Sequence, residues 1–170
     1  PEYIGYANQC LEEGMFAAQR PQISRTRPHR FKYHIDFENL NLGPDIAALC
    51  VSRPTNPSGN VIPDSELQRL AVLAKDHQIP LIIDNAYGWP FPGIVFGEAT
   101  PIWNEQTVHV MSLSKFGLPG TRTAFVVAPP EIAKAVSSMM AVTGLANGNF
   151  GQSIAGPLIA DGRITRLSRE

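Results

Sequence analysis

The sequence of 170 residues has few cysteines, little net charge and no long apolar run. Two cysteines, Cys10 and Cys50, are too few for a disulfide framework, and no zinc-type spacing is visible, so we expect no metal site and a reducing, cytoplasmic location. A formal net charge of -1 creates no field that would attract nucleic acid or an anionic membrane. Because no apolar run reaches membrane-spanning length and no signal peptide is visible, we expect no membrane association.

Positive charge is nevertheless concentrated between residues 20 and 32. No aromatic interleaving and no nucleic-acid-binding motif accompanies these cations. We therefore interpret residues 25–30 as a solvated loop after a brief strand at 20–24, and we expect no nucleic-acid partner. The cluster consists of Arg20, Arg25, Arg27, Arg30 and Lys32.

Apolar runs of strand length alternate with helical patterns along the chain. The run at 45–51 is almost continuously apolar, which is typical of a parallel strand buried on both faces, so Cys50 is expected to be a buried thiol. The alternation predicts an α/β fold with a three-layer arrangement, a mainly parallel sheet flanked by helices. Further strands are expected at 80–83, 108–111 and 124–128, and helices at 4–16, 36–42, 64–77 (with Asp64 as N-cap), 130–140 and from 152 onward.

Polar residues follow the carboxyl ends of three expected strands. Ligands of such sheets bind beyond these ends, so we predict that Asn56, Asp84 and Ser112 face one crevice. A carboxylate at a buried strand end is costly without a positive partner, and a protonated pyridine nitrogen would be one. The alternatives are an Asp84 that caps its loop, an Asn56 that serves its turn and a Tyr87 that is only a loop aromatic.

The stretch from residue 112 to 122 carries two hydroxyls, an amine and a guanidinium between two expected strands. A lysine there loses hydration, which favours the neutral amine that attacks a carbonyl. Ser112, Ser114 and Arg122 offer the groups that proteins use to hold a phosphate. Taken alone, a polar turn with Lys115 at the surface is an equally good interpretation.

Together these motifs resemble those of the fold-type I pyridoxal-phosphate enzymes, the aspartate aminotransferase superfamily. The resemblance rests on Asn-Pro-Ser-Gly at 56–59, on Asp-x-x-Tyr at 84–87, and on Ser-x-Ser-Lys at 112–115 followed by Pro-Gly-x-Arg at 119–122. It covers about the middle 70 residues, and chance is a poor explanation for so specific a set.

The resemblance implies a role for each motif residue around pyridoxal 5′-phosphate. Lys115 would be the catalytic residue, covalently joined to the cofactor and later moving a proton between substrate and cofactor. Asp84 would pair with the pyridinium nitrogen, and Tyr87 and Asn56 would hydrogen-bond the ring oxygen. The phosphate would be held by Ser112, Ser114 and Arg122.

A closer resemblance, to a pyruvate-using aminotransferase of this superfamily, covers most of the first 120 residues. It implies transamination between a valine- or alanine-like amino acid and a 2-oxo acid such as pyruvate. Complete chains of the superfamily are more than twice as long and form homodimers. We therefore expect residues 1–170 to be a fragment of the large, cofactor-binding domain of a homodimeric parent. The N-terminal segment and the C-terminal small domain, with the arginine for the substrate carboxylate, would be absent, leaving little or no activity.

Three alternatives remain open from the sequence. The same cofactor site could serve another pyridoxal-phosphate reaction, such as that of a lyase or a decarboxylase. It could also belong to a non-catalytic, cofactor-binding domain of a regulator. A nucleotide-binding Rossmann-like domain is disfavoured because no Gly-x-Gly-x-x-Gly follows a strand.

Overall fold

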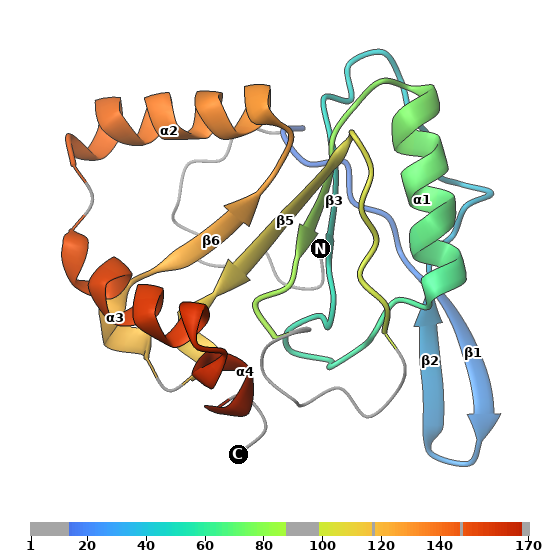
Figure 1. Ribbon diagram of the computed structural model, residues 1–170. Coiled ribbons are helices and arrows are strands. Elements are labelled where there is room, and N and C mark those ends of the chain that lie inside the picture. The colour runs from blue at the N-terminus through green and yellow to red at the C-terminus, as the bar shows by residue number, and fades with distance from the viewer. Residues whose placement is uncertain (1–13, 88–98, 117, 147, 168–170) are drawn as a thin grey trace.

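The computed structural model describes residues 14–87, 99–116, 118–146 and 148–167 (Figure 1). The helix expected at 4–16 lies almost wholly outside these ranges, and its last three positions are not helical. The strands are β1 (Gln22–Arg27), β2 (Arg30–His34), β3 (Leu49–Ser52), β4 (Leu81–Asp84), β5 (Thr107–Ser112) and β6 (Ala124–Val127). The α-helices are α1 (Asp64–Asp76), α2 (Pro130–Gly144), α3 (Asn149–Ala160) and α4 (Arg163–Leu167), with 3-10 turns η1 (Leu113–Phe116) and η2 (Pro119–Thr121).

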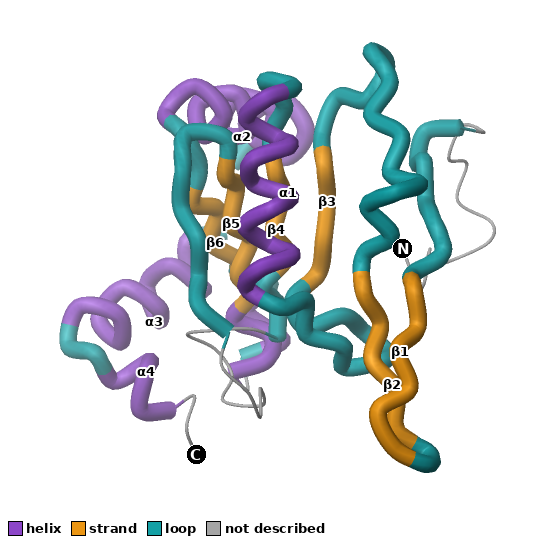
Figure 2. Tube along the Cα trace, turned by 90° about the vertical axis from the view of Figure 1, so that its right-hand side faces the viewer, coloured by secondary structure: helices purple, strands orange, loops and turns teal. Residues whose placement is uncertain are grey.

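The central sheet has the strand order β3-β4-β5-β6. The β3–β4 and β4–β5 pairs are parallel, and the β5–β6 pair is antiparallel. Residues 113–123, which join β5 to β6, are too few for the helical crossover that a parallel pair requires. Helices flank the sheet, with α1 beside β3 and β4 and the later helices beside its β6 end (Figures 1 and 2). The α/β class with a mainly parallel, helix-flanked sheet is confirmed.

The main hydrophobic core lies between α1 and the parallel strands. The helix presents Leu67, Leu70, Ala71 and Ala74 at the spacing of one helical face, and all of them are buried. They pack with Leu49, Leu81 and Ile83 of the sheet. A smaller core, at the other end of the sheet, joins Leu113 to Ala155 and Ile164 of α3 and α4.

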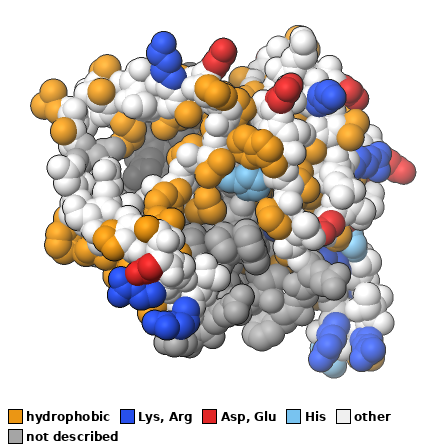
Figure 3. Space-filling model, in the orientation of Figure 1, with side chains coloured by type: hydrophobic (Ala, Val, Ile, Leu, Met, Phe, Trp, Pro, Cys, Tyr) orange, Lys and Arg blue, Asp and Glu red, His pale blue; other side chains and the backbone are white. Residues whose placement is uncertain are grey.

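The basic segment forms an antiparallel hairpin of β1 and β2. The strand expected at 20–24 overlaps the start of β1, but the loop expected at 25–30 is confined to the turn at 28–29. The turn lies at its tip, where His29 has a φ of 61°. In Figure 3, Lys and Arg side chains gather at this end of the molecule. The four arginines are exposed as expected, but Lys32 is half-buried and donates hydrogen bonds to Asn60 Oδ1 (2.8 Å) and to the Val61 carbonyl.

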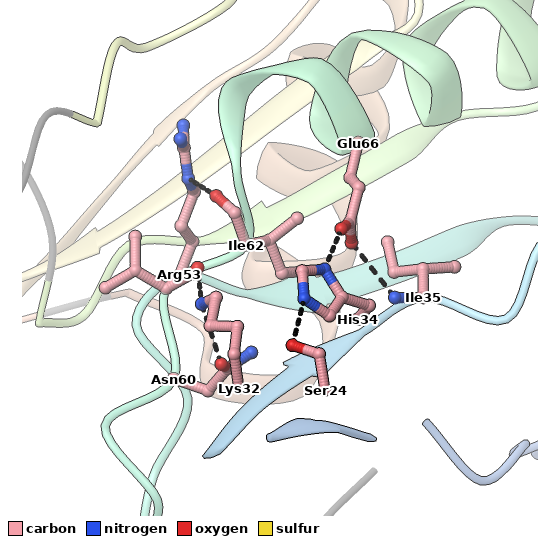
Figure 4. A network of polar contacts seen from close by, with 9 residues as sticks. Ser24, Lys32, His34, Ile35, Arg53, Asn60, Ile62 and Glu66 are labelled. Carbon is pink, nitrogen blue, oxygen red and sulfur yellow. Dashed lines mark hydrogen bonds and ion pairs between the residues drawn. The ribbon is translucent and has the colours of Figure 1, made fainter. Parts of the chain in front are cut away.

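A polar network attaches the hairpin to α1 (Figure 4). Glu66 accepts a hydrogen bond from His34 Nδ1 (2.5 Å) through one carboxylate oxygen and one from the Ile35 amide (2.9 Å) through the other. The second imidazole nitrogen of His34 lies 2.9 Å from Ser24 Oγ. The contact between hairpin and helix therefore depends on directional bonds between part-buried groups.

Other boundaries differ from the prediction for local reasons. Asp64 is the first residue of α1 and not its N-cap, because its carboxylate accepts hydrogen bonds from Arg53 and from the Thr100 amide. Residues 36–42 form bends and no helix, and the Asp36 carboxylate there accepts from Asn39 (2.6 Å) and Gln22 (3.0 Å).

Strand β3 is shorter than predicted, and Cys50 on it is an exposed free thiol, contrary to the expectation of a buried one. Cys50 pairs in register with Ile82, and the two alternate with the Leu49, Leu81 and Ile83 side chains that face α1. Among the described residues, β3 has a paired neighbour on one side only. The face of β3 that carries Cys50 points away from the core at α1, so the expectation of a strand buried on both faces is wrong.

Candidate functional site

The candidate site lies at the carboxyl ends of the three parallel strands. Ser52, Asp84 and Ser112 are the last residues of β3, β4 and β5. Ser52 pairs with Asp84, and Asp84 pairs with Val110, two residues before Ser112. Because strand side chains alternate with a period of two, the side chains of Ser52, Asp84 and Ser112 leave the sheet on the same face.

The Asp84 carboxylate is half-buried and bound by neutral donors. Its Oδ2 accepts a hydrogen bond from Ser52 Oγ at 3.2 Å, and its Oδ1 accepts one from the Ala86 amide at 2.9 Å. No ion pair reaches it within the described ranges. The site therefore offers an oriented negative charge to a cationic ligand group.

Lys115 and Tyr87 meet at the end of the sheet. Lys115 lies in η1, directly after β5, and the buried Leu113 anchors the start of that turn. The Lys115 Nζ lies 4.5 Å from the centroid of the Tyr87 ring. An ammonium over an aromatic face is attracted by the ring quadrupole, so this pair brings together two predicted site residues that follow different strands.

The three residues predicted to hold a phosphate lie around the two 3-10 turns. Ser112 Oγ accepts a hydrogen bond from the Ser114 amide at 3.1 Å, which fixes both serines at the end of β5. Arg122 ends η2 in the left-handed region, with φ 48°, and its exposed guanidinium donates to the Pro119 carbonyl at 3.3 Å.

Asn56 lies on the exposed turn after β3. In the part of the chain that the structure describes, no contact joins Asn56 or Arg122 to the Lys115–Tyr87 pair. The structure thus shows where each predicted residue lies, and the assignment of their roles stays a prediction.

Sequence reasoning missed a buried arginine that supports the turn carrying Asn56. Arg53 is 4% exposed and donates to the carbonyls of Ile62 and Thr100, each at 2.8 Å, and to the Asp64 carboxylate. The hydrogen bond from Arg53 is the main cause that lowers the pKa of Asp64. A basic residue in a turn gives no signal of burial in the sequence, because its partners are distant in the chain.

A second missed pair lies beside Asp84. Asn85 and His109 are both 8% exposed, and they share a hydrogen bond of 2.7 Å. His109 lies within an apolar strand, and Asn85 lies between two motif residues, so only the occurrence of a polar residue among apolar ones could have indicated them.

The described residues include neither a metal-binding cluster nor a membrane-spanning helix. They contain no group of three or more His, Cys, Asp or Glu that could hold a metal ion. The helices among them are too short or too polar to cross a membrane.

Comparison with known proteins supplies relatives along the whole chain. The model of the family "Aminotransferase class I and II" matches residues 20–161. The valine–pyruvate aminotransferase of Escherichia coli K12 is 51% identical over 168 residues, which is 99% of this chain and 40% of the relative. The closer resemblance of the first 120 residues, to valine–pyruvate aminotransferase, is therefore confirmed.

Solved structures agree with the sequence relatives. The crystal structure of valine–pyruvate aminotransferase from Salmonella typhimurium superposes with a TM-score of 0.83 at 48% identity, covering 88% of this chain and 38% of that one. The crystal structure of a putative amino-acid aminotransferase from Psychrobacter arcticum superposes with a TM-score of 0.84 at 50% identity. The match covers 90% of this chain and 37% of that one. The chain thus spans about 40% of the length of these relatives. It belongs to the aminotransferase class I and II family.

Proposed function

We propose that this chain is part of the large, cofactor-binding domain of a longer, pyridoxal-phosphate-dependent aminotransferase. The enzyme exchanges an amino group between a valine- or alanine-like amino acid and a 2-oxo acid such as pyruvate. The relatives from Escherichia coli and Salmonella, which are valine–pyruvate aminotransferases, support these substrates. The observation that carries the chemistry is the amine of Lys115 over the ring of Tyr87, which lies on the loop that follows Asp84.

The donor set of the site fits pyridoxal phosphate. An aromatic ring with a protonated nitrogen suits the Asp84 carboxylate, which only neutral donors bind among the described residues. The phenol of Tyr87 and the amide of Asn56 suit the ring oxygen, and Ser112, Ser114 and Arg122 suit a phosphate. When bound, the cofactor would supply an electron sink for the bonds at the substrate Cα.

The chain's own groups then have distinct tasks. Asp84 holds a proton on the pyridine nitrogen by its charge, and Ser52 and the Ala86 amide keep its carboxylate oriented. Lys115 Nζ is the group that takes and returns the proton at the substrate Cα, a role that fits an exposed amine on a short turn. Tyr87 packs beside that amine and limits where Nζ can lie.

We also propose that the full-length protein is a cytoplasmic homodimer. Cys50, which is a free thiol on β3, supports a reducing compartment. An apolar surface in and after α2 supports a partner subunit, since Met139, Val142 and Leu145 are 67%, 84% and 90% exposed. The substrate carboxylate would be bound by a residue outside this chain, so we expect residues 1–170 alone to have little or no activity.

The test is an assay of alanine formation from valine and pyruvate by the full-length protein. We expect turnover in the wild type, loss of at least about a thousandfold in Lys115→Ala, and no change in Lys134→Ala, which alters an exposed lysine of α2. Retained turnover in Lys115→Ala would contradict the proposal. Release of ammonia or carbon dioxide without alanine would favour a lyase or a decarboxylase.

A further inference from the structure

His109 is a buried histidine with two fixed hydrogen bonds. Its Nε2 lies 2.6 Å from the Ile102 carbonyl oxygen, and its Nδ1 lies 2.7 Å from Asn85 Nδ2. A carbonyl oxygen only accepts, so Nε2 carries the proton and Nδ1 accepts from the Asn85 amide. The Trp103 ring stacks on the imidazole at a centroid distance of 6.2 Å and an interplanar angle of 20°.

The bond to Asn85 acts on the loop that carries the site. The backbone amide of Asn85 donates a hydrogen bond to the Val110 carbonyl at 2.7 Å. The backbone and the side chain of Asn85 are therefore both attached to β5. Asn85 lies between Asp84 and Ala86, and the Asp84 carboxylate accepts a hydrogen bond from the backbone amide of Ala86. The orientation of Asp84 and the start of Tyr87 therefore depend on how Asn85 is held.

Simple packing does not account for a histidine at this position. His109 pairs in register with Ile83, whose side chain belongs to the main core, and with Val127 on the other side. An apolar side chain would fill this place without the cost of burying a polar ring. An apolar side chain would, however, leave the side-chain amide of Asn85 without its hydrogen-bond acceptor. The histidine therefore serves to orient Asn85.

We propose that His109 is a positioning residue for the coenzyme site, acting through Asn85 on Asp84 and Tyr87. This rests on the proposed function, in which Asp84 and Tyr87 contact the coenzyme. His109 itself lies on β5 beside Ile83 and touches no reacting atom.

Two matched variants separate positioning from packing. In His109→Asn the side-chain carboxamide ends near the place of Nδ1, so it can still accept from Asn85. In His109→Gln it reaches the place of Nε2, so the bond to Ile102 is kept and the acceptor for Asn85 is lost. Each variant removes one of the two bonds, and we expect similar losses of thermal stability.

The first readout is hydrogen exchange in the full-length apoprotein, which does not involve the coenzyme. We expect the amides of Ala86 and Tyr87 to exchange about tenfold faster in His109→Gln and at nearly the wild-type rate in His109→Asn. The second readout is the dissociation constant of pyridoxal phosphate, which we expect to rise about tenfold in His109→Gln and to stay within about threefold in His109→Asn. Asn85→Leu should reproduce the Gln variant, and the double variant should add little to either.

Equal changes in both His109 variants, following their loss of stability, would overturn the proposal. Additive effects of His109→Gln and Asn85→Leu on exchange and on the dissociation constant would also overturn it. This comparison does not use His109→Asn, so it still tests the proposal if that variant folds poorly. If the wild type binds no pyridoxal phosphate, the proposed function fails and the positioning role falls with it. If the wild type binds it and His109→Gln binds equally well, only the positioning role fails.

Discussion

The hairpin β1–β2 and the parallel strands β3 and β4 are attached to the same helix by opposite means. The strands pack against α1 through fully apolar contacts, in which Leu67 and Leu81 are 1% and 0% exposed. The hairpin reaches α1 through Glu66, the residue next to Leu67, by hydrogen bonds from His34 and from the Ile35 amide. One helix thus serves an apolar interface on one face and a polar interface at its first turn.

The difference shows which contacts a sequence reveals. Burial of apolar surface is non-directional, so a stripe of apolar residues at helical spacing is enough to indicate that α1 covers a sheet. A polar contact depends on one partner at one distance and angle, and Glu66 lies 32 positions after His34. No local pattern joins such residues.

The largest expected effect comes from the apolar interface. Leu67→Ala in the full-length protein should lower the free energy of unfolding by about 2–5 kcal/mol, because it removes a fully buried side chain and leaves a cavity. Denaturant unfolding measures it. Val72→Ala, on the exposed face of the same helix, is the control and should stay within about 0.5 kcal/mol of the wild type. Equal losses in the two variants would contradict an apolar core at this face.

The polar interface should give a smaller and more local effect. Glu66→Gln removes the charge that accepts from His34 and Ile35, and we expect a loss of about 1–2 kcal/mol. Hydrogen exchange should accelerate in β1 and β2 and stay unchanged in β4. Glu38→Gln, an exposed carboxylate, should alter neither. Faster exchange in β4 and the hairpin alike would show that the two regions open together.

The smallest effect concerns pH at the start of α1. The hydrogen bond from Arg53, followed by those from Thr100, lowers the pKa of Asp64 below its ordinary value of 3.8. A carboxylate with a lowered pKa in the folded state contributes stability above that ordinary value and loses it as the pH falls through the folded value. Asp64→Asn should therefore flatten the acid side of the stability profile below about pH 4. A profile as steep as that of the wild type would show that other carboxylates cause the acid loss.

The parts of the fold that were predictable are those with continuous apolar patterns. The run at 80–83 became β4, that at 108–111 became β5, and the period of Leu67, Leu70, Ala71 and Ala74 gave α1 within one residue of its observed end. The prediction failed at the hairpin, where alternating arginines resemble a solvated loop until a partner strand pairs with them. It also failed at Cys50, because an apolar run does not show whether both faces of its strand are covered.

For the candidate site, the placement of residues at strand ends was predictable and the support beneath them was not. The rule that ligands bind beyond the carboxyl ends of parallel strands led to Asp84 and Ser112. His109 and Asn85 belong to no motif, and their pairing depends on the register between β4 and β5. Register follows from tertiary contacts that a single sequence does not display.

The most direct test of the account is to locate the lysine that holds the coenzyme. Borohydride reduction of the full-length protein after incubation with pyridoxal phosphate fixes the coenzyme to that amine, and mass spectrometry of the digested protein identifies the peptide. We predict one modified site, Lys115, and no fixation in Lys115→Ala. Modification of Lys32, Lys75 or Lys134 in its place, or no fixation in the wild type, would contradict it.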